Sequence, residues 1–433
     1  MRFDQSDRLR AKARQIIPGG CHAYAKADSE YPQLSPGFIR RGQGCHVWDV
    51  DGNEFIEYAP GNRSVSLGHA YQPVIDAITD ELQRGVNFTR PAEIEVRAAE
   101  RLLSVLTDAE MVKFCKNGSD ATSAAIRLAR AATGREHIGC CADHPFFSFD
   151  DWFITTTPHS AGIPETVKAT TVAFQYNNIE SVRKLFEKHK DRISCLILEP
   201  ARYEEPRNDF LSEVKQACRD NGALLIFDEM ITGFRWHIGG GQATYNVNPD
   251  LACWGKAMAN GYSVSALTGK RKYMELGDLS VPDHNLFLLS TTHGAETHAL
   301  AAMMATLDTY TNLPVIETFY RQGQKLADGF NRLIAQHRLW DAVEVVGRPC
   351  CLSYQTKDAT GQLSPILRAL FLQETIRRGI LMSSLVVTYS HSDADIDRTL
   401  AAIDGALGIY AKALQEGTKK YLIGSPPRPI YCR

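Results

Sequence analysis

Short apolar runs alternate with amphipathic segments in the middle of the chain, from about residue 70 to 300. Four of these runs are MVKFC (111–115), SCLIL (194–198), ALLIF (223–227) and LACW (251–254). Such continuous runs suit strands that are covered on both faces. Over 120–132, small and apolar residues recur with helical spacing, and Gly134 follows as at many helix ends. The pattern predicts a largely parallel sheet in an α/β domain.

The flanking segments have a different pattern. A helix is expected over 6–17, and GCHVWDVDGNEFIEY (44–58) alternates around Asp51-Gly52 as a β-hairpin does. Beyond 310, three helical segments and the strand-like VEVVG lack βαβ regularity, which indicates a smaller α+β domain. We therefore expect an N-terminal segment (1–65) and a C-terminal segment (311–433) to form the small domain, and residues 66–310 the large one.

Composition argues against several classes of function. The 433 residues include 48 basic and 50 acidic side chains without a long run of either sign, so nucleic acid is not an expected partner. No run approaches the roughly 18 apolar residues of a membrane span, and the charged start is unlike a signal peptide. We expect a cytoplasmic protein that does not bind membranes. The 11 cysteines lack any CxxC pair, which favours reduced, mostly buried thiols and no metal.

Two charged residues stand directly after apolar runs. Asp228 follows ALLIF, and functional groups of open α/β sheets gather at the carboxyl ends of strands. Lys256 follows LACW among small residues, where partial desolvation would make its amine easier to deprotonate for carbonyl chemistry. Alone, Asp228 could be a capping or salt-bridged carboxylate and Lys256 a surface lysine. Together they favour a functional site.

A third motif, Lys116-Asn117-Gly118-Ser119-Asp120, joins MVKFC to the helical segment. Gly118 permits close backbone approach, the Ser119 hydroxyl can donate a hydrogen bond, and free amides at a helix start favour a phosphate. The alternative is a turn with no ligand. The spacing is neither that of a dinucleotide fingerprint nor that of a P-loop.

In this order the three motifs resemble the class III (subgroup II) aminotransferases of fold type I, and in particular the aminomutases of the glutamate-1-semialdehyde type. The resemblance covers most of the chain and includes IPGG (17–20), VWDVDGNEFIEY (47–58), LGHA (67–70), NGSDATSAAIRLARAATGR (117–135), DEMITGFR (228–235), GKAMANGY (255–262) and STTHGAE (290–296). It implies a seven-stranded, mainly parallel sheet, pyridoxal 5′-phosphate as cofactor, and a homodimer whose subunits share their active sites.

The resemblance also implies roles for three residues around the cofactor ring. Lys256 matches the Schiff-base lysine, Asp228 the carboxylate that keeps the pyridine nitrogen protonated, and Met230 the residue packed against one ring face. These roles suit the chemistry, because a protonated ring withdraws electrons from the reacting carbon and an amine beside it can move the proton.

Further roles follow from the same resemblance. The turn Asn117, Gly118 and Ser119 matches the phosphate-binding turn, and Thr292 matches a threonine that reaches the phosphate from the neighbouring subunit. Phe146 matches the aromatic residue on the other ring face, although the phenylalanines of HPFFSFDDW (144–152) could equally belong to the core.

The substrate-binding residues depart from the family pattern. Lys26 stands where the aminomutases have an arginine, and a lysine lacks the planar fork that grips a carboxylate through two hydrogen bonds. Asn62 and Arg63 stand near the place of an aromatic residue. With Tyr24 and His22 they would form a polar pocket for a substrate rich in hydroxyl or phosphate groups, such as a sugar derivative or a biosynthetic intermediate. Ordinary loop residues are the alternative.

The expected function is that of an aminotransferase that moves an amino group between a small-molecule donor, such as glutamate, and an aldehyde or ketone acceptor. An aminomutase, which returns the nitrogen to the adjacent carbon of the same molecule, is the first alternative. Racemisation or decarboxylation would begin with the same proton removal. A catalytically silent scaffold would need neither Lys256 nor Asp228.

Overall fold

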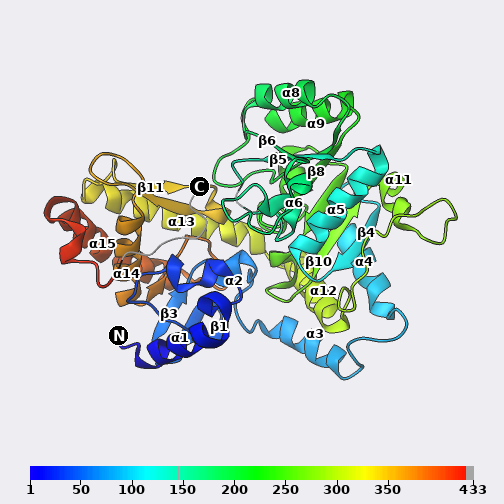
Figure 1. Cartoon of the computed structure of the whole chain (residues 1–433). Helices are drawn as coiled ribbons and strands as arrows, with labels where there is room; N and C mark the ends of the chain where they lie inside the picture. Colours follow the sequence, from blue (N-terminus) through cyan, green and yellow to red (C-terminus); the bar gives the residue numbers. More distant parts are fainter. Residues whose placement is uncertain (145, 426–433) are drawn as a thin grey trace. The chain divides into compact units, whose positions relative to one another are not determined.

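The apolar runs of the central region form a seven-stranded sheet in the computed structural model, which describes residues 1–144 and 146–425 (Figure 1). The strand order is β4-β10-β9-β8-β7-β5-β6. All neighbouring pairs from β9 to β6 are parallel, whereas β10 is antiparallel to both β4 and β9. The strands are β4 Met111–Cys115, β5 His137–Cys141, β6 Thr171–Phe174, β7 Ile193–Leu198, β8 Leu224–Asp228, β9 Leu251–Trp254 and β10 Ser265–Gly269.

The chain divides into two units, which we call the sheet unit and the terminal unit. The sheet unit is Gln72–Ile316, and the terminal unit combines Met1–Tyr71 with Glu317–Arg433. The helices of the chain are α1 Asp4–Ile16, α2 Pro60–Arg63, α3 Gln72–Leu82, α4 Glu93–Val105, α5 Gly118–Thr133, α6 Asp151–Ile154, α7 Glu165–Lys168, α8 Ile179–Lys188, α9 Phe210–Asp220, α10 Gly240–Tyr245, α11 Arg271–Met274, α12 Thr297–Asn312, α13 Val315–Gln336, α14 Pro365–Arg377 and α15 Asp393–Glu416.

Burial along the central strands explains their apolar sequence. Every residue of β5, β7, β8, β9 and β10 is buried, while the edge strands β4 and β6 keep exposed positions. Removing a large side chain such as Phe227 from this core would cost about 3–5 kcal/mol of unfolding free energy, because the cavity would not fully collapse. The core thereby fixes the ends of β7, β8 and β9, from which functional side chains project.

Helix α5 packs against β7, β9 and β10 through small residues, among them Ala121, Ala124 and Ala125. It begins two residues earlier than expected, because Asn117 caps its first turn. It ends as expected at Gly134, whose left-handed conformation (φ 66°) lets its N–H donate to the Arg130 carbonyl.

The terminal unit contains a four-stranded sheet in the order β1-β2-β3-β13 and a two-stranded sheet, β11-β12. The expected hairpin is β2–β3, whose turn is closed by Asp49 Oδ1 accepting from the amides of Asp51 and Asn53. Strand β13 adds in parallel beside β3. The strands are β1 Ile39–Gln43, β2 His46–Asp49, β3 Glu54–Glu57, β11 Val343–Val346, β12 Ser353–Thr356 and β13 Ile380–Leu381.

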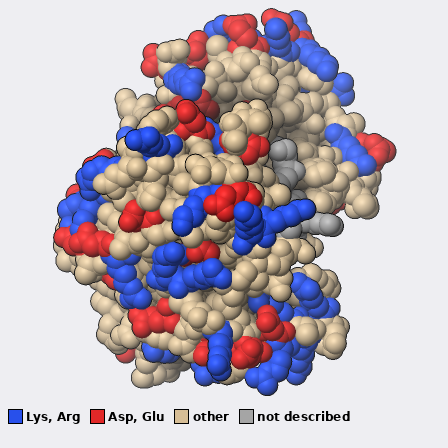
Figure 2. All heavy atoms as spheres, turned by 90° about the vertical axis from the view of Figure 1, so that its left-hand side faces the viewer, with Lys and Arg blue, Asp and Glu red and all other residues tan. Residues whose placement is uncertain are grey.

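The face of the molecule drawn in Figure 2 shows no large patch of a single charge. Basic and acidic side chains lie next to one another there (Figure 2), in keeping with the formal net charge of −2. Among the helices of the described residues, none combines the length and the apolar character that a bilayer crossing requires.

Candidate active site

Three charged residues lie at or just after the carboxyl ends of β7, β8 and β9, at one edge of the large sheet. In the β7–β8 register Leu198 pairs with Phe227, so Glu199 and Asp228 come next on neighbouring strands. In the β8–β9 register Asp228 pairs with Cys253, three residues before Lys256. The charge of Lys256 acts on Asp228. The structure therefore brings together the two residues on which the sequence analysis placed most weight.

The electrostatics of Asp228 suit a cationic ligand. Burial, followed by the negative charge of Glu199, raises the pKa of the Asp228 carboxyl to about 7, while Lys256 opposes this shift. Asp228 Oδ1 accepts from the Met230 amide at 2.9 Å. Within the described residues, Glu199 Oε2 is buried and accepts no hydrogen bond. A protonated ring nitrogen would relieve the repulsion between these two carboxylates.

Met230 lies against two glycines that line the same edge. A Cβ atom at Gly118 would come within 3.0 Å of Met230 Sδ, and a Cβ atom at Gly255 within 2.7 Å. Only glycine allows the backbone to approach the methionine this closely. The next residue, Lys256, has a left-handed φ of 49°, a conformation that non-glycine residues seldom adopt and that occurs often at functional sites. Gly118, Met230 and Gly255 thus lie close together at this edge, and Lys256 directly follows Gly255.

The turn at the start of α5 differs from the sequence expectation in one respect. Asn117 Oδ1 accepts from the amides of Ser119 (3.0 Å) and Asp120 (3.3 Å), so these two amides are not free for a phosphate. The expectation of free amides was wrong because it did not foresee that Asn117 would be the N-cap. Gly118, packed on Met230, and the buried hydroxyl of Ser119, which accepts from the Phe149 amide at 3.1 Å, remain candidates for phosphate binding.

The phenylalanines after β5 separate into core and surface residues. Phe147 is 2% exposed and packs edge-on against His144 and Phe153, so it belongs to the core. Phe146 is 43% exposed and also packs edge-on against Phe153. Phe146 is therefore partly exposed, and its role in stacking on the cofactor stays a prediction.

Thr292 lies in an exposed stretch of the sheet unit. Its backbone carbonyl accepts from the Asn87 side chain at 2.8 Å, and the residue itself is exposed. This exposure suits a residue that acts beyond its own subunit, although the assignment still rests on the family resemblance.

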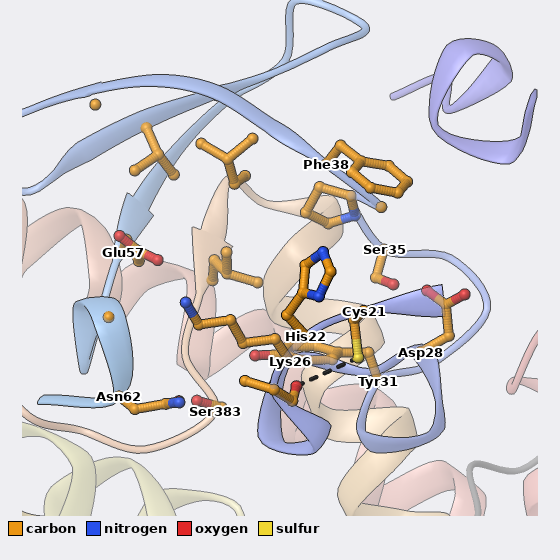
Figure 3. A pocket seen from close by; sticks show the side chains of 18 of the residues that line it. Cys21, His22, Lys26, Asp28, Tyr31, Ser35, Phe38, Glu57, Asn62 and Ser383 are labelled. Atoms are coloured by element: carbon orange, nitrogen blue, oxygen red, sulfur yellow. Dashed lines mark hydrogen bonds between the residues drawn. The ribbon is translucent and has the colours of Figure 1, made fainter. Parts of the chain in front are cut away.

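The terminal unit contains a pocket of about 620 Å³ that includes part of the predicted substrate-binding set. His22, Lys26 and Asn62 line it, and in Figure 3 the Lys26 amine points toward the side where Glu57 and Asn62 lie. The described residues that line this pocket do not include Tyr24 or Arg63. The structure thus gathers three residues of the set and leaves the other two outside.

The pocket carries charges of both signs, and several are already paired. Glu57 Oε2 contacts His69 Nε2 at 2.7 Å, and Asp28 Oδ1 accepts from Arg10 Nε at 2.8 Å. Arg10, Arg40 and Arg41 also line the pocket, and Arg10 is already paired with Asp7 and Asp28. The pocket thus combines paired acids, a lysine and arginines, and it offers many hydrogen-bonding groups.

The family model for class-III aminotransferases matches residues 27–407. The chain belongs to the class-III aminotransferase family. Glutamate-1-semialdehyde 2,1-aminomutase of Chloroflexus aggregans is 32% identical to it over 94% of this chain and 98% of that protein. The enzyme of the same name from Desulfitobacterium hafniense is 33% identical over 90% and 95%, respectively.

Solved structures agree with this family. The FumI protein of Sphingopyxis sp. MTA144, in its PLP internal aldimine form, shares 27% identity with a TM-score of 0.89 and covers 99% of this class-III chain and all of its own. A glutamate-1-semialdehyde aminomutase from Pseudomonas aeruginosa PAO1 has the same fold, with a TM-score of 0.82 at 18% identity over 94% of this chain and 95% of its own. The predicted family, fold type I and pyridoxal 5′-phosphate as cofactor are confirmed.

Two acidic residues at the sheet edge, Glu199 and Glu229, were not predicted from the sequence. Glu199 follows SCLIL just as Asp228 follows ALLIF, so the same signal was present and could have been used. Glu229 is fully buried, and burial raises the pKa of its carboxyl to about 7. It accepts from the amides of Gly241 and Gln242 at 2.7 and 2.8 Å, contacts that no local pattern predicts.

Away from the sheet edge, Cys45, His46 and Asp395 are the one group of described residues that could hold a metal ion. Their polar atoms are already paired with one another: Asp395 Oδ1 lies 3.0 Å from His46 Nε2, and Asp395 Oδ2 accepts from Cys45 Sγ at 3.5 Å. Asp395 also belongs to the capping box of α15 with Ser392. These contacts give the group a structural role without an ion.

Proposed function

We propose that this class-III enzyme is a pyridoxal-phosphate-dependent aminotransferase acting on an amino donor, such as glutamate, and an aldehyde or ketone acceptor. One observation carries the proposal. Asp228, Met230 and Lys256 project from adjoining parallel strands of one sheet, beside the Gly118-Ser119 turn. A carboxylate, an apolar ring contact, an amine and a turn for an anion are the groups that this cofactor requires.

Each residue has a distinct task in this proposal. Asp228 would hold the proton on the ring nitrogen, because the negative charge of the carboxylate stabilises the cation beside it. When bound, the cofactor supplies the electron sink that the amino-bearing carbon needs. Lys256 Nζ would remove the proton from that carbon of the substrate and return it, as general base and then general acid. Met230 and Phe146 would orient the ring between them.

Substrate specificity is assigned to the terminal unit. Lys26 offers an ammonium group, and His22 and Asn62 offer further hydrogen-bonding groups. We propose that they favour a substrate with hydroxyl or phosphate groups, because Lys26 lacks the planar fork that an arginine at its position would offer to a carboxylate. Tyr24 and Arg63, which do not line the pocket, are no longer included in this assignment.

The exposed Thr292 supports the further proposal that the enzyme works as a homodimer. In that arrangement Thr292 of each subunit would contribute to the phosphate site of the other. Sedimentation or size-exclusion analysis of the purified protein tests the dimer, and a monomer with full activity would exclude the shared site.

A glutamate-1-semialdehyde-type aminomutase is the second candidate, because curated relatives with that name are 32–33% identical over most of this chain. The cofactor spectrum separates the two functions. An aminotransferase incubated with glutamate alone should convert the cofactor to its amine form and release one equivalent of 2-oxoglutarate. Rapid conversion of glutamate-1-semialdehyde to 5-aminolevulinate, with no net use of a donor, would instead support the aminomutase and overturn the proposed pocket specificity.

A further inference from the structure

Lys116 fixes the predicted phosphate turn at three points. Its amide donates to Asp120 Oδ2 at 3.2 Å, and its carbonyl accepts from Ser263 Oγ at 2.9 Å. Its side-chain ammonium forms an ion pair with Glu296. Asp120 belongs to the turn itself, Ser263 lies seven residues after Lys256, and Glu296 lies four residues after Thr292. A single residue thus ties together three segments on which the cofactor site depends.

The ion pair is better shielded than an ordinary surface pair. The side chain of Glu296 is 13% exposed and that of Lys116 is 32% exposed. The bond from Lys116, supported by one from His293 Nδ1 at 2.8 Å, holds the pKa of the Glu296 carboxyl below its usual range despite partial burial. The carboxylate therefore stays ionised at neutral pH and keeps the lysine engaged.

We infer that the Lys116–Glu296 ion pair is a positioning element that pre-organises the phosphate turn, so that cofactor affinity depends on it. The inference rests on the proposed function, because it assumes that the Gly118-Ser119 turn receives the cofactor phosphate. A turn held in its bound conformation before the ligand arrives loses less conformational entropy on binding. Lys116 acts here through Glu296 and not as a direct ligand of the anion.

Direct charge attraction and positioning of the turn predict opposite changes in cofactor affinity for one substitution. Glu296→Gln removes a negative charge near the turn, so if Lys116 simply attracted the phosphate, affinity for the anion would rise. If the pair positions the turn, the same substitution weakens binding. Lys116→Gln weakens binding in either case, so Glu296→Gln decides between them.

The test measures the dissociation constants of pyridoxal 5′-phosphate and of pyridoxal, which lacks the phosphate, for the ligand-free protein by absorbance titration. We expect Glu296→Gln to weaken pyridoxal 5′-phosphate binding about five-fold and to leave pyridoxal binding unchanged, because a partly exposed pair contributes modestly. The double variant Lys116→Gln/Glu296→Gln should bind pyridoxal 5′-phosphate no more weakly than the weaker of the two single variants. Each single change already removes the same ion pair. Ser263→Ala leaves the charges intact. It should weaken pyridoxal 5′-phosphate binding less than Glu296→Gln does, and it should leave pyridoxal binding unchanged.

A control is the Lys168–Glu165 pair of α7, whose lysine side chain is 31% exposed, close to the 32% of Lys116, but whose glutamate side chain is 86% exposed. Lys168→Gln should change neither constant. Unchanged or tighter pyridoxal 5′-phosphate binding by Glu296→Gln would overturn the inference while leaving the proposed function intact. Equal losses for both ligands would also overturn it, since they would indicate a general loss of structure. An unmodified protein that binds neither ligand would overturn the proposed function together with this inference.

Discussion

The sheet edge and the terminal-unit pocket differ in how firmly the fold fixes their side chains. At the edge, Asp228, Glu229 and Met230 are all buried, and they follow a strand whose register is set on both sides. In the pocket, Lys26 is exposed and lies on one of three short 3-10 turns, Pro18–Gly20, Tyr24–Lys26 and Asp28–Glu30. Reaction chemistry is thus assigned to the rigid region, and substrate choice to the adaptable one.

This difference has a physical basis. A residue in the buried edge cannot change size or charge without disturbing packed neighbours, whereas a residue on an exposed turn can change at little cost in stability. Substitutions at the edge should therefore alter rate and stability together, while substitutions in the pocket should alter only the preference for substrate.

The largest effect is expected for Lys256→Ala. Loss of the proton-transferring amine should lower kcat on the order of a thousand-fold or more, in the range of a general acid–base group. Steady-state assays and borohydride reduction, followed by mass analysis of the modified peptide, measure the effect. Lys113→Ala, on the exposed position of edge strand β4, is the control and should keep full activity. Modification of a different lysine would contradict the assignment.

Asp228→Asn should lower kcat on the order of a hundred-fold, because a neutral amide cannot hold the ring proton as a carboxylate does. The same substitution should stabilise the ligand-free protein. The folded-state pKa of Asp228 is raised from 3.8 to about 7, so the native state binds more protons than the unfolded state between these pH values. The unfolding free energy of the unmodified protein therefore falls as pH rises through that window.

Urea denaturation of the ligand-free proteins at pH 4, 5, 6, 7 and 8 measures this gain. The difference in unfolding free energy between Asp228→Asn and the unmodified protein should grow from pH 4 to 7 and stay constant above pH 7. A residual slope is expected in both proteins, because the pKa of Glu229 is raised to about 7 as well. A variant that is less stable than the parent at pH 8 would show that the Asp228 carboxylate is not destabilising.

The sequence predicted the buried edge much better than the pocket. Strands β4, β7, β8 and β9 were predicted within about one residue, since continuous apolar runs record burial on both faces. Strand β10, SALTG, was missed because a serine, a threonine and a glycine interrupt its apolar pattern, although all five residues are buried. Strand β10 pairs with the nearby β9 and also with β4, which lies far away in the sequence, and the second pairing has no local signal.

The pocket depends on contacts that no local pattern encodes. Lys26 and Asn62 are 36 residues apart, and Leu381 and Ser383 of the same pocket are more than 300 residues further on. Tyr24 was grouped with Lys26 because it is near in sequence, yet its side chain is 51% exposed and its ring packs near Gly19. Neighbouring residues on a 3-10 turn point in different directions, so Lys26 lines the pocket and Tyr24 does not.

Glu229→Gln should have an intermediate effect, mainly on stability. Both carboxylate oxygens accept hydrogen bonds, one from the Gly241 amide and the other from the Gln242 amide. A glutamine has one acceptor oxygen, so its NH₂ group would face an amide N–H and leave it buried without a partner, at a cost of about 1–3 kcal/mol. Urea denaturation measures the loss, with the surface variant Glu213→Gln as control. An unchanged unfolding free energy would show that the 240–242 segment relaxes.

The smallest effect is expected in the pocket, where Lys26→Ala should raise KM for the preferred acceptor about five-fold with kcat unchanged, because an exposed lysine contributes binding but no chemistry. Tyr24→Phe is the matched control on the same turn and should change neither constant.

Lys26→Arg tests whether the residue at position 26 sets the preference for substrate. If the missing arginine fork at position 26 is what disfavours glutamate-1-semialdehyde, this variant should gain activity toward that substrate. A kcat that falls with KM unchanged in Lys26→Ala would instead place this lysine in the reaction chemistry and end the division between a catalytic edge and a specificity pocket.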